Sequence, residues 1–248
     1  MNSKIMALFR QLRRTVFKVQ SVYDRHYHDD HIPRAKYVGR ENWQKHLYAL
    51  AAHPGFRVLE VGSSIETGQN TSDRANFYPA CYIGFDIRAG PNVDVVGDAH
   101  QLSNYFSPQD KFDLIYSAAS FEHFAMPWIV AAEMAKMLKT GGYVFVETMF
   151  SFPSHCRPWH FYHFSDLGLR ALFPESLGIE HVDSGMSGPI VGRWTALAEP
   201  HLVNRIVPGL YAYSEFLGTK IRDVPNFNWN NISTKDISGS TEYPGGTE

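Results

Sequence analysis

The stretch FRVLEVGSS, residues 56–64, decides how this chain folds. Its apolar run from Phe56 to Val61 is too short for a typical helix, and it stops at Gly62, as a buried strand does before a tight turn. Short apolar runs of the same kind recur at residues 81–85, 93–96, 112–117 and 143–147. Because these short buried runs alternate with helical patterns, we expect a mainly parallel sheet in a three-layer arrangement.

Helical patterns separate the predicted strands. We expect helices over residues 41–52, over 127–138, where Pro127 suits the first turn, and from a candidate cap at Ser165 to Phe173. Two last strands, expected at residues 179–184 and 190–197, would form a hairpin at the sheet edge. The predicted fold is therefore α/β: a Rossmann-like, mainly parallel, seven-stranded sheet with helices on both faces, in three layers.

Three segments are predicted along the chain. Residues 1–52 would form a helical N-terminal segment and candidate lid, residues 53–200 the α/β domain, and residues 201–248 a helical extension with a flexible tail. Residues 3–23 have apolar positions at helical spacing and a basic opposite face, which fits either contact with a membrane surface or a solvated helix face. Residues 24–31 fit a lid or a connector, and residues 210–217 a homodimer face or local core.

Composition excludes several classes of protein. The chain has 248 residues, 44% of them hydrophobic, which is enough for a full core, and its formal net charge of -2 gives no basic field for nucleic acid. Its two cysteines cannot build a disulfide framework or a cysteine zinc site. No apolar run approaches the roughly 20 residues of a transmembrane helix, and no signal peptide pattern is present, so we expect a cytoplasmic protein.

Polar residues follow the predicted strands where ligands of such sheets bind. Gly62 would let the backbone approach a ligand closely, and Asp86 could accept hydrogen bonds from both hydroxyls of a ribose. Asp98, after the third strand, could accept from an adenine amino group, and Glu60 would favour a nearby cation. Each residue alone has a simpler explanation as a turn glycine or a helix cap.

The order of these pieces resembles the class I S-adenosylmethionine-dependent methyltransferases and is similar to their type 11 group. The resemblance covers about residues 55–175 and is carried by VLEVG (58–62), GFD (84–86), GDA (97–99), FDLI (112–115), FEH (121–123) and LKTGG (138–142). It implies a transferase that binds S-adenosyl-L-methionine and releases S-adenosyl-L-homocysteine. By position, it implies cofactor contacts at Glu60, Gly62, Ser63, Ser64, Asp86, Ile87, Asp98, Ala99, Ser117 and Ala118.

The sequence departs from the family pattern after its first strand. Serines at 63 and 64 replace the usual glycines, and the polar segment from Gly68 to Tyr82 leaves little room for a full first helix. A non-catalytic binding module with the same fold therefore stays open as an alternative. An NAD-dependent oxidoreductase is disfavoured, because the chain lacks Gly-x-Gly-x-x-Gly after the first strand.

A histidine-rich segment, residues 155–165, is the predicted acceptor wall. It resembles a type 11 segment, with His160 and His163 where that group has Asp and Arg. Together with His123, which follows the fourth strand, these are the candidate catalytic bases for a hydroxyl acceptor. The family suggests a small-molecule or saccharide acceptor, with O, N and C all open as the methylated atom. The histidine spacing matches no zinc signature, so no metal is expected.

Overall fold

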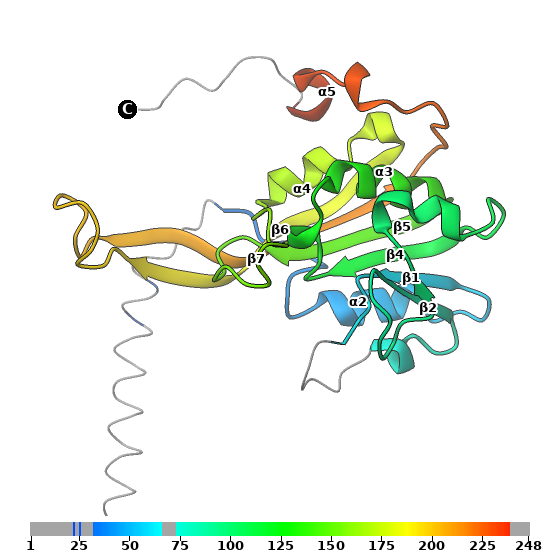
Figure 1. Ribbon diagram of the computed structural model, residues 1–248, viewed down its shortest axis with the longest axis horizontal. Helices are drawn as coiled ribbons and strands as arrows, with labels where there is room; N and C mark the ends of the chain where they lie inside the picture. Colours follow the sequence, from blue (N-terminus) through cyan, green and yellow to red (C-terminus); the bar gives the residue numbers. More distant parts are fainter. Residues whose placement is uncertain (1–21, 23–24, 26–31, 66–72, 239–248) are drawn as a thin grey trace, which may run out of the picture. The chain divides into compact units, whose positions relative to one another are not determined.

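The computed structural model describes residues 22, 25, 32–65 and 73–238 (Figure 1). The chain divides into two compact units, Pro33–Ser187 with Ala212–Glu248, and Met1–Ile32 with Gly188–Tyr211. The candidate site lies in the first unit. Almost all of the predicted N-terminal helix and lid, and the tail beyond residue 238, fall outside the described residues.

Seven strands form one sheet in the order β3-β2-β1-β4-β5-β7-β6. Four neighbouring pairs are parallel and the pair of β5 and β7 is antiparallel, which confirms the predicted mainly parallel α/β fold. The strands are β1 Arg57–Val61, β2 Cys81–Asp86, β3 Val95–Val96, β4 Phe112–Ala118, β5 Leu138–Met149, β6 Ile179–Arg193 and β7 Ile206–Lys220.

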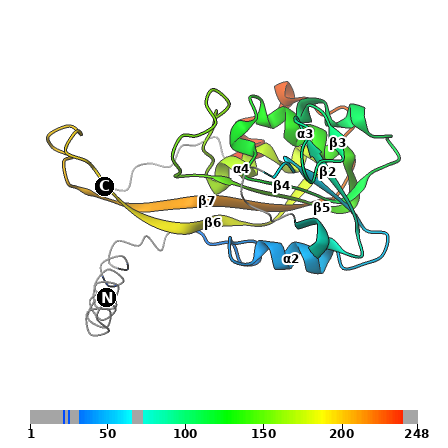
Figure 2. The same cartoon turned by 60° about the horizontal axis from the view of Figure 1, so that its bottom comes forward.

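Helices cover both faces of this sheet, with α2 on one face and α3 and α4 on the other (Figure 2). The α-helices are α2 Trp43–Leu50, α3 Pro127–Met137, α4 Asp166–Leu172 and α5 Thr234–Ser238. The 3-10 helices are η1 Asp73–Phe77, η2 Ala99–Tyr105, η3 Phe121–His123, η4 Glu175–Leu177 and η5 Trp229–Asn231. Within the described part of the chain, no helix is long and apolar enough to cross a membrane.

The core consists of two clusters, one on each face of the sheet. In β1, Val58 belongs to the cluster beneath α2, whereas Leu59 and Val61 belong to the cluster beneath α3 and α4. Strand residues that alternate between two apolar layers explain why these runs read as continuous in the sequence. The three predicted layers are therefore present.

Local signals in the sequence set several element ends. Pro127 begins α3, as predicted, and Oγ of Ser165 accepts the N–H of Gly168 at 3.0 Å to cap α4. Between β1 and β2, the described residues contain only the short η1, in line with the predicted loss of a full first helix. Asp113 accepts the N–H of Arg57 at 2.8 Å at the edge away from the site.

The C-terminal half of the sheet differs from the prediction. The two strands expected at 179–184 and 190–197 are one long strand, β6, and the sheet neighbour of β6 is β7 from within the expected helical extension. β7 is rich in aromatic and β-branched residues, which favour strands. Phe216 and Leu217 are fully buried in the sheet, which makes them local core instead of an exposed dimer face.

Candidate active site

The strand order reverses between β1 and β4, and the crevice of an open α/β sheet lies at such a point. Gly62 follows β1 with φ +85°, a left-handed conformation that L side chains rarely adopt. A Cβ atom at Gly62 would lie 2.0 Å from Oγ of Ser120, beyond the end of β4. Only glycine lets these two segments approach so closely, which fits a site where backbone approaches a ligand.

The loop after β1 is held by the end of β2. The N–H of Ser63 donates to the carbonyl of Phe85 at 3.1 Å, and the N–H of Ser64 donates to Oδ2 of Asp86 at 3.0 Å. Oδ1 of Asp86 accepts the N–H of Arg88, also at 3.0 Å. The structure therefore brings three of the predicted cofactor residues together, with Asp86 as the anchor of the serine loop.

Asp86 retains capacity to accept further hydrogen bonds. An ionised carboxylate offers about four lone-pair directions, and the two backbone contacts use only part of them. The next side chain, Ile87, is 65% exposed and places an apolar surface beside the carboxylate. A carboxylate next to an apolar side chain is the pattern that a ribose and an adjoining adenine edge require.

Asp98 caps η2 after β3. Its Oδ1 accepts the backbone N–H of His100 at 2.9 Å and lies 2.6 Å from Nδ1 of the same histidine. Burial raises the pKa of Asp98, but the two contacts with His100 outweigh burial, and the net shift is downward. Ala99 is 6% exposed and belongs to the core, so only its backbone can face a ligand.

The end of β4 lies beside the end of β1, where the strand order reverses. Ser117 is fully buried and its Oγ donates to the carbonyl of Val61 at 2.7 Å, so its side chain joins β4 to β1. Ala118 is partly exposed, and Ala119 follows with φ +51°. This left-handed residue turns the chain toward η3, which carries His123.

Glu60 lies beneath the serine loop. Its Oε2 accepts the hydroxyl of Tyr82 and, at 3.1 Å, Nδ2 of Asn92. The same Asn92 amide donates to the carbonyl of Ser63 at 3.1 Å and so links Glu60 to the loop. Burial raises the pKa of Glu60 to about 7, while the hydrogen bond from Asn92 and the charge of Arg74 act in the opposite direction. Sequence reasoning missed Asn92, which lies in an irregular loop.

The predicted acceptor segment is fastened to η3. The N–H groups of Phe161 and Tyr162 both donate to the carbonyl of Glu122, at 2.8 and 3.3 Å. The hydroxyl of Tyr162 donates to the carbonyl of Ala125 at 3.1 Å. The loop between β5 and α4 therefore lies against the segment that follows β4.

Four imidazole rings form one contiguous group in this loop and η3. Ring centroids lie 4.9 Å apart for His123 and His155, 4.5 Å for His155 and His160, and 4.8 Å for His160 and His163. The structure thus brings the three candidate catalytic histidines together and adds His155 to them.

Hydrogen-bond partners indicate which nitrogen of each ring carries the proton. Nδ1 of His123 lies 2.5 Å from the carbonyl oxygen of Trp159, and a carbonyl only accepts, so Nδ1 carries hydrogen and Nε2 of the neutral ring holds a lone pair. Nδ1 of His160 accepts the N–H of His155 at 3.0 Å, so the hydrogen of neutral His160 is on Nε2. Burial lowers the pKa of His160, and the rings of His155 and His163 act in the same direction.

Comparison with known proteins identifies the family. A family model described as "Methyltransferase domain" matches residues 34–181, which is more than half of the chain. The chain belongs to this family. It is an S-adenosylmethionine-dependent methyltransferase, and the class, the enzyme activity and the cofactor predicted from its motifs are confirmed.

One solved structure supports the fold at a TM-score above 0.5, and two further methyltransferase structures are similar at slightly lower scores. A protein from Bacillus halodurans that is described as a methyltransferase has a TM-score of 0.51 at 14% identity, over 72% of this chain and 98% of that one. A SAM-dependent methyltransferase from Archaeoglobus fulgidus has a TM-score of 0.49 at 16% identity, over 73% and 96%. The 1,6-didemethyltoxoflavin-N1-methyltransferase of Burkholderia thailandensis has a TM-score of 0.49 at 15% identity, over 72% and 76%. A search of curated proteins finds no significant match.

The methyltransferase also buries acidic residues that sequence reasoning did not single out. Glu147 of β5 and Glu215 of β7 are direct partners in the antiparallel register and are 1% and 0% exposed. Arg40 pairs with Glu147, and the hydroxyl of Ser187 donates to Glu215. Burial raises the pKa of Glu147 to about 7 and that of Glu215 to about 8. A glutamate inside an apolar strand run, as at Glu147, was the signal available in the sequence.

Proposed function

We propose that this methyltransferase transfers the methyl group of S-adenosylmethionine to a hydroxyl group of a small-molecule or glycan-type acceptor. The observation that carries the proposal is the orientation of His123. Its Nδ1 is engaged by the carbonyl of Trp159, so the lone pair on Nε2 is left to accept a proton. His123 lies in η3, the short helix that follows β4, near the carboxyl ends of the parallel strands.

Cofactor binding in this proposal uses the residues around the crevice. Asp86 accepts the ribose hydroxyls, Ile87 packs along the adenine edge, and Asp98 accepts from the adenine amino group. The backbone at Gly62, Ser63 and the end of β4 would line the methionine part, and Gly62, which has no side chain, would let that backbone approach it closely. When bound, S-adenosylmethionine supplies a methyl group whose S–C bond breaks as the new O–C bond forms, leaving S-adenosylhomocysteine.

His123 and the histidines around it have different roles toward the acceptor in this proposal. Nε2 of His123 takes the hydroxyl proton, and the buried carboxylate of Glu122, with Oε1 at 3.9 Å from that nitrogen, favours the resulting positive charge. Nε2 of His160 is buried and, within the described residues, has no hydrogen-bond partner, which suits a donor that orients an acceptor oxygen. His163, next to His160, extends this wall.

The acceptor class can be tested directly. Purified protein would be incubated with S-adenosylmethionine and a panel of paired acceptors that differ only in a hydroxyl or an amino group, and S-adenosylhomocysteine formation would be measured. Turnover restricted to the hydroxyl-bearing members is expected, because only these require a base. Turnover restricted to the amines would overturn the proposed acceptor class.

Substituting His123 should separate chemistry from cofactor binding. His123→Ala is expected to lower kcat by roughly 100-fold or more, because general-base catalysis contributes about that factor, while S-adenosylhomocysteine affinity changes by less than about twofold. His53→Ala, at an exposed position before β1, is the matched control. A fully active His123→Ala enzyme would exclude His123 as the base.

A further inference from the structure

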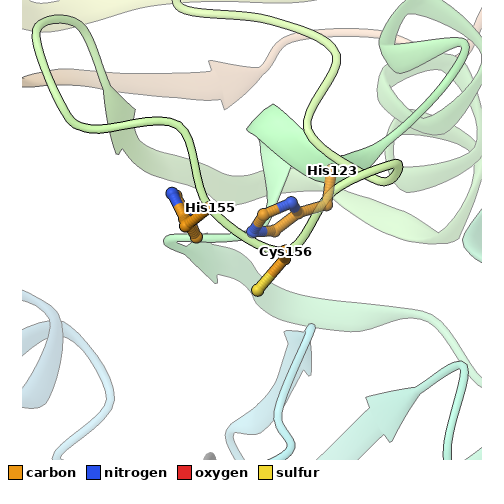
Figure 3. Close-up of side chains that lie close together, drawn as sticks. All are labelled: His123, His155 and Cys156. Atoms are coloured by element: carbon orange, nitrogen blue, oxygen red, sulfur yellow. The ribbon is translucent and has the colours of Figure 1, made fainter.

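The side chains of His123, His155 and Cys156 lie close together (Figure 3). One candidate ligand atom from each residue lies within 4.8 Å of the other two. His123 comes from η3, whereas His155 and Cys156 are consecutive in the loop after β5, so the fold and not the sequence spacing brings the three together. Two imidazoles and a thiol are the ligand types that zinc and its neighbouring transition metals prefer.

Both histidines are oriented as metal ligands usually are. Nδ1 of His123 lies 2.5 Å from the carbonyl oxygen of Trp159, and Nδ1 of His155 lies 3.0 Å from the carbonyl oxygen of Pro153. Metal-binding histidines commonly donate their second ring N–H to a backbone carbonyl, which fixes the tautomer and the ring orientation. The lone pairs of both Nε2 atoms are therefore left for an ion.

An unpaired buried carboxylate oxygen adds a second, independent observation. Oε1 of Glu122 is buried, has no hydrogen-bond partner among the residues that the structure describes, and lies 3.9 Å from Nε2 of His123. Oε2 of the same carboxylate accepts the hydroxyl of Thr148 at 2.6 Å and so holds the group in place. A buried carboxylate oxygen that lacks a donor and lies near the ring nitrogen favours a cation nearby.

We propose that His123, His155 and Cys156 bind a single zinc-class divalent transition-metal ion, with the charge of Glu122 beside it. Ligand atoms around a tetrahedral zinc ion lie about 3.3–3.8 Å apart, so binding needs the side chains to close by about 1 Å. The side chain of Cys156 is exposed and those of both histidines are partly exposed, which leaves room for that movement. Three protein ligands leave a fourth position for water.

One consequence rests on the proposed function. The lone pair on Nε2 of His123 cannot bind a metal ion and accept the acceptor proton at the same time. The metal-loaded enzyme is therefore expected to lose methyl-transfer activity, and removal of the ion by a chelator should restore it.

Cobalt substitution tests the site without any need for activity. Full-length, reduced protein that has been stripped with a chelator would be titrated with Co²⁺, and the visible absorption followed. A tetrahedral spectrum with a thiolate-to-cobalt charge-transfer band, saturating at one ion per chain and displaced by Zn²⁺, is expected. Cys156→Ser should abolish the charge-transfer band, and His155→Gln should weaken Zn²⁺ binding at least tenfold.

Matched variants guard against adventitious binding. Cys81→Ser removes the other cysteine, which is also exposed, and His53→Gln removes an exposed histidine, and neither should change the spectrum or the affinity. A charge-transfer band that survives Cys156→Ser, or Zn²⁺ affinity unchanged by His155→Gln, would overturn the metal site. Metal binding with full activity would leave the site standing and instead exclude His123 as the base, so the two proposals fail separately.

Discussion

Replacing Asp86 with alanine is expected to weaken S-adenosylhomocysteine binding roughly 100-fold. Asp86 is the last residue of β2, at the carboxyl edge of the parallel strands, and its two backbone contacts leave lone pairs for both ribose hydroxyls. A hydrogen bond to a charged group contributes about 1.5 kcal/mol or more, and losing two amounts to about two orders of magnitude in Kd. Calorimetric titration with S-adenosylhomocysteine measures this change.

Asp110→Ala is the matched control for Asp86→Ala. Asp110 precedes β4 at the opposite edge of the sheet, is exposed, and forms a 3.9 Å ion pair with Arg57. Exposed ion pairs of this length contribute little, so the control should bind S-adenosylhomocysteine as the natural protein does and unfold at nearly the same temperature. Unchanged affinity in Asp86→Ala would exclude Asp86 as a ribose ligand.

A ligand analogue separates a direct ribose contact from an effect on the serine loop. Because Asp86 also anchors the N–H of Ser64, its loss could displace the loop without any ribose contact. If the carboxylate touches the ribose, the natural protein discriminates S-adenosylhomocysteine from its 2′-deoxy analogue, and Asp86→Ala loses that discrimination. If only the loop is displaced, both ligands weaken equally and the discrimination persists.

The first strands of the parallel half could be predicted because they are short, buried and, in β1 and β2, stopped by Gly62 and Asp86, whereas β5 is 12 residues long and extends beyond the expected residues 143–147 at both ends. β1, β2 and β4 begin and end within about two residues of the sequence expectation, since Gly62 and Asp86 stop the apolar runs. The prediction of the antiparallel half, β6 and β7, was wrong for a physical reason. β6 continues through residues 185–189, where the sequence predicts a turn between two strands, and β7 lies within the predicted helical extension although its residues pair with β5.

In the candidate site, too, local sequence predicts some features and only the three-dimensional fold creates the others. Asp86 and Asp98 could be proposed as cofactor residues from the sequence because the strand-end rule needs only local sequence. The contact between His123 and His155 depends on the loop hydrogen bonds to Glu122, and the adjacency of Glu147 and Glu215 depends on the β5–β7 register. Neither relation is encoded by local spacing, which is why the histidine spacing alone pointed away from a metal ion.

Glu215→Gln is expected to stabilise the protein at alkaline pH. Glu147 and Glu215 are direct partners in the β5–β7 register, Arg40 pairs with Glu147, and Oε2 of each carboxyl has no hydrogen-bond partner in the described part of the chain. Burial raises the pKa of Glu215 to about 8, from an ordinary value of 4.5. The folded protein therefore holds a proton that the unfolded chain has lost between these two pH values.

The sign of the pH dependence follows from this difference in bound protons. Between pH 4.5 and about 8 the folded state binds more protons than the unfolded state, so the free energy of unfolding falls as pH rises. An amide cannot ionise, and its NH₂ can donate to the unpartnered Oε2 of Glu147 while its oxygen still accepts from Ser187. The variant should therefore match the natural protein near pH 5 and exceed its stability by about 2–4 kcal/mol near pH 9.

Thermal unfolding of both proteins across pH 5–9 measures this difference. A gain of about 2–4 kcal/mol corresponds to a rise in Tm of roughly 5–10 °C for a chain of this size, confined to the alkaline end of the range. Glu180→Gln, at an exposed glutamate of β6, controls for the simple loss of one charge and should leave the pH profile unchanged. If Glu215→Gln instead lowers stability equally at every pH, the buried carboxyl is ionised throughout and its attraction to Arg40 outweighs the cost of burial.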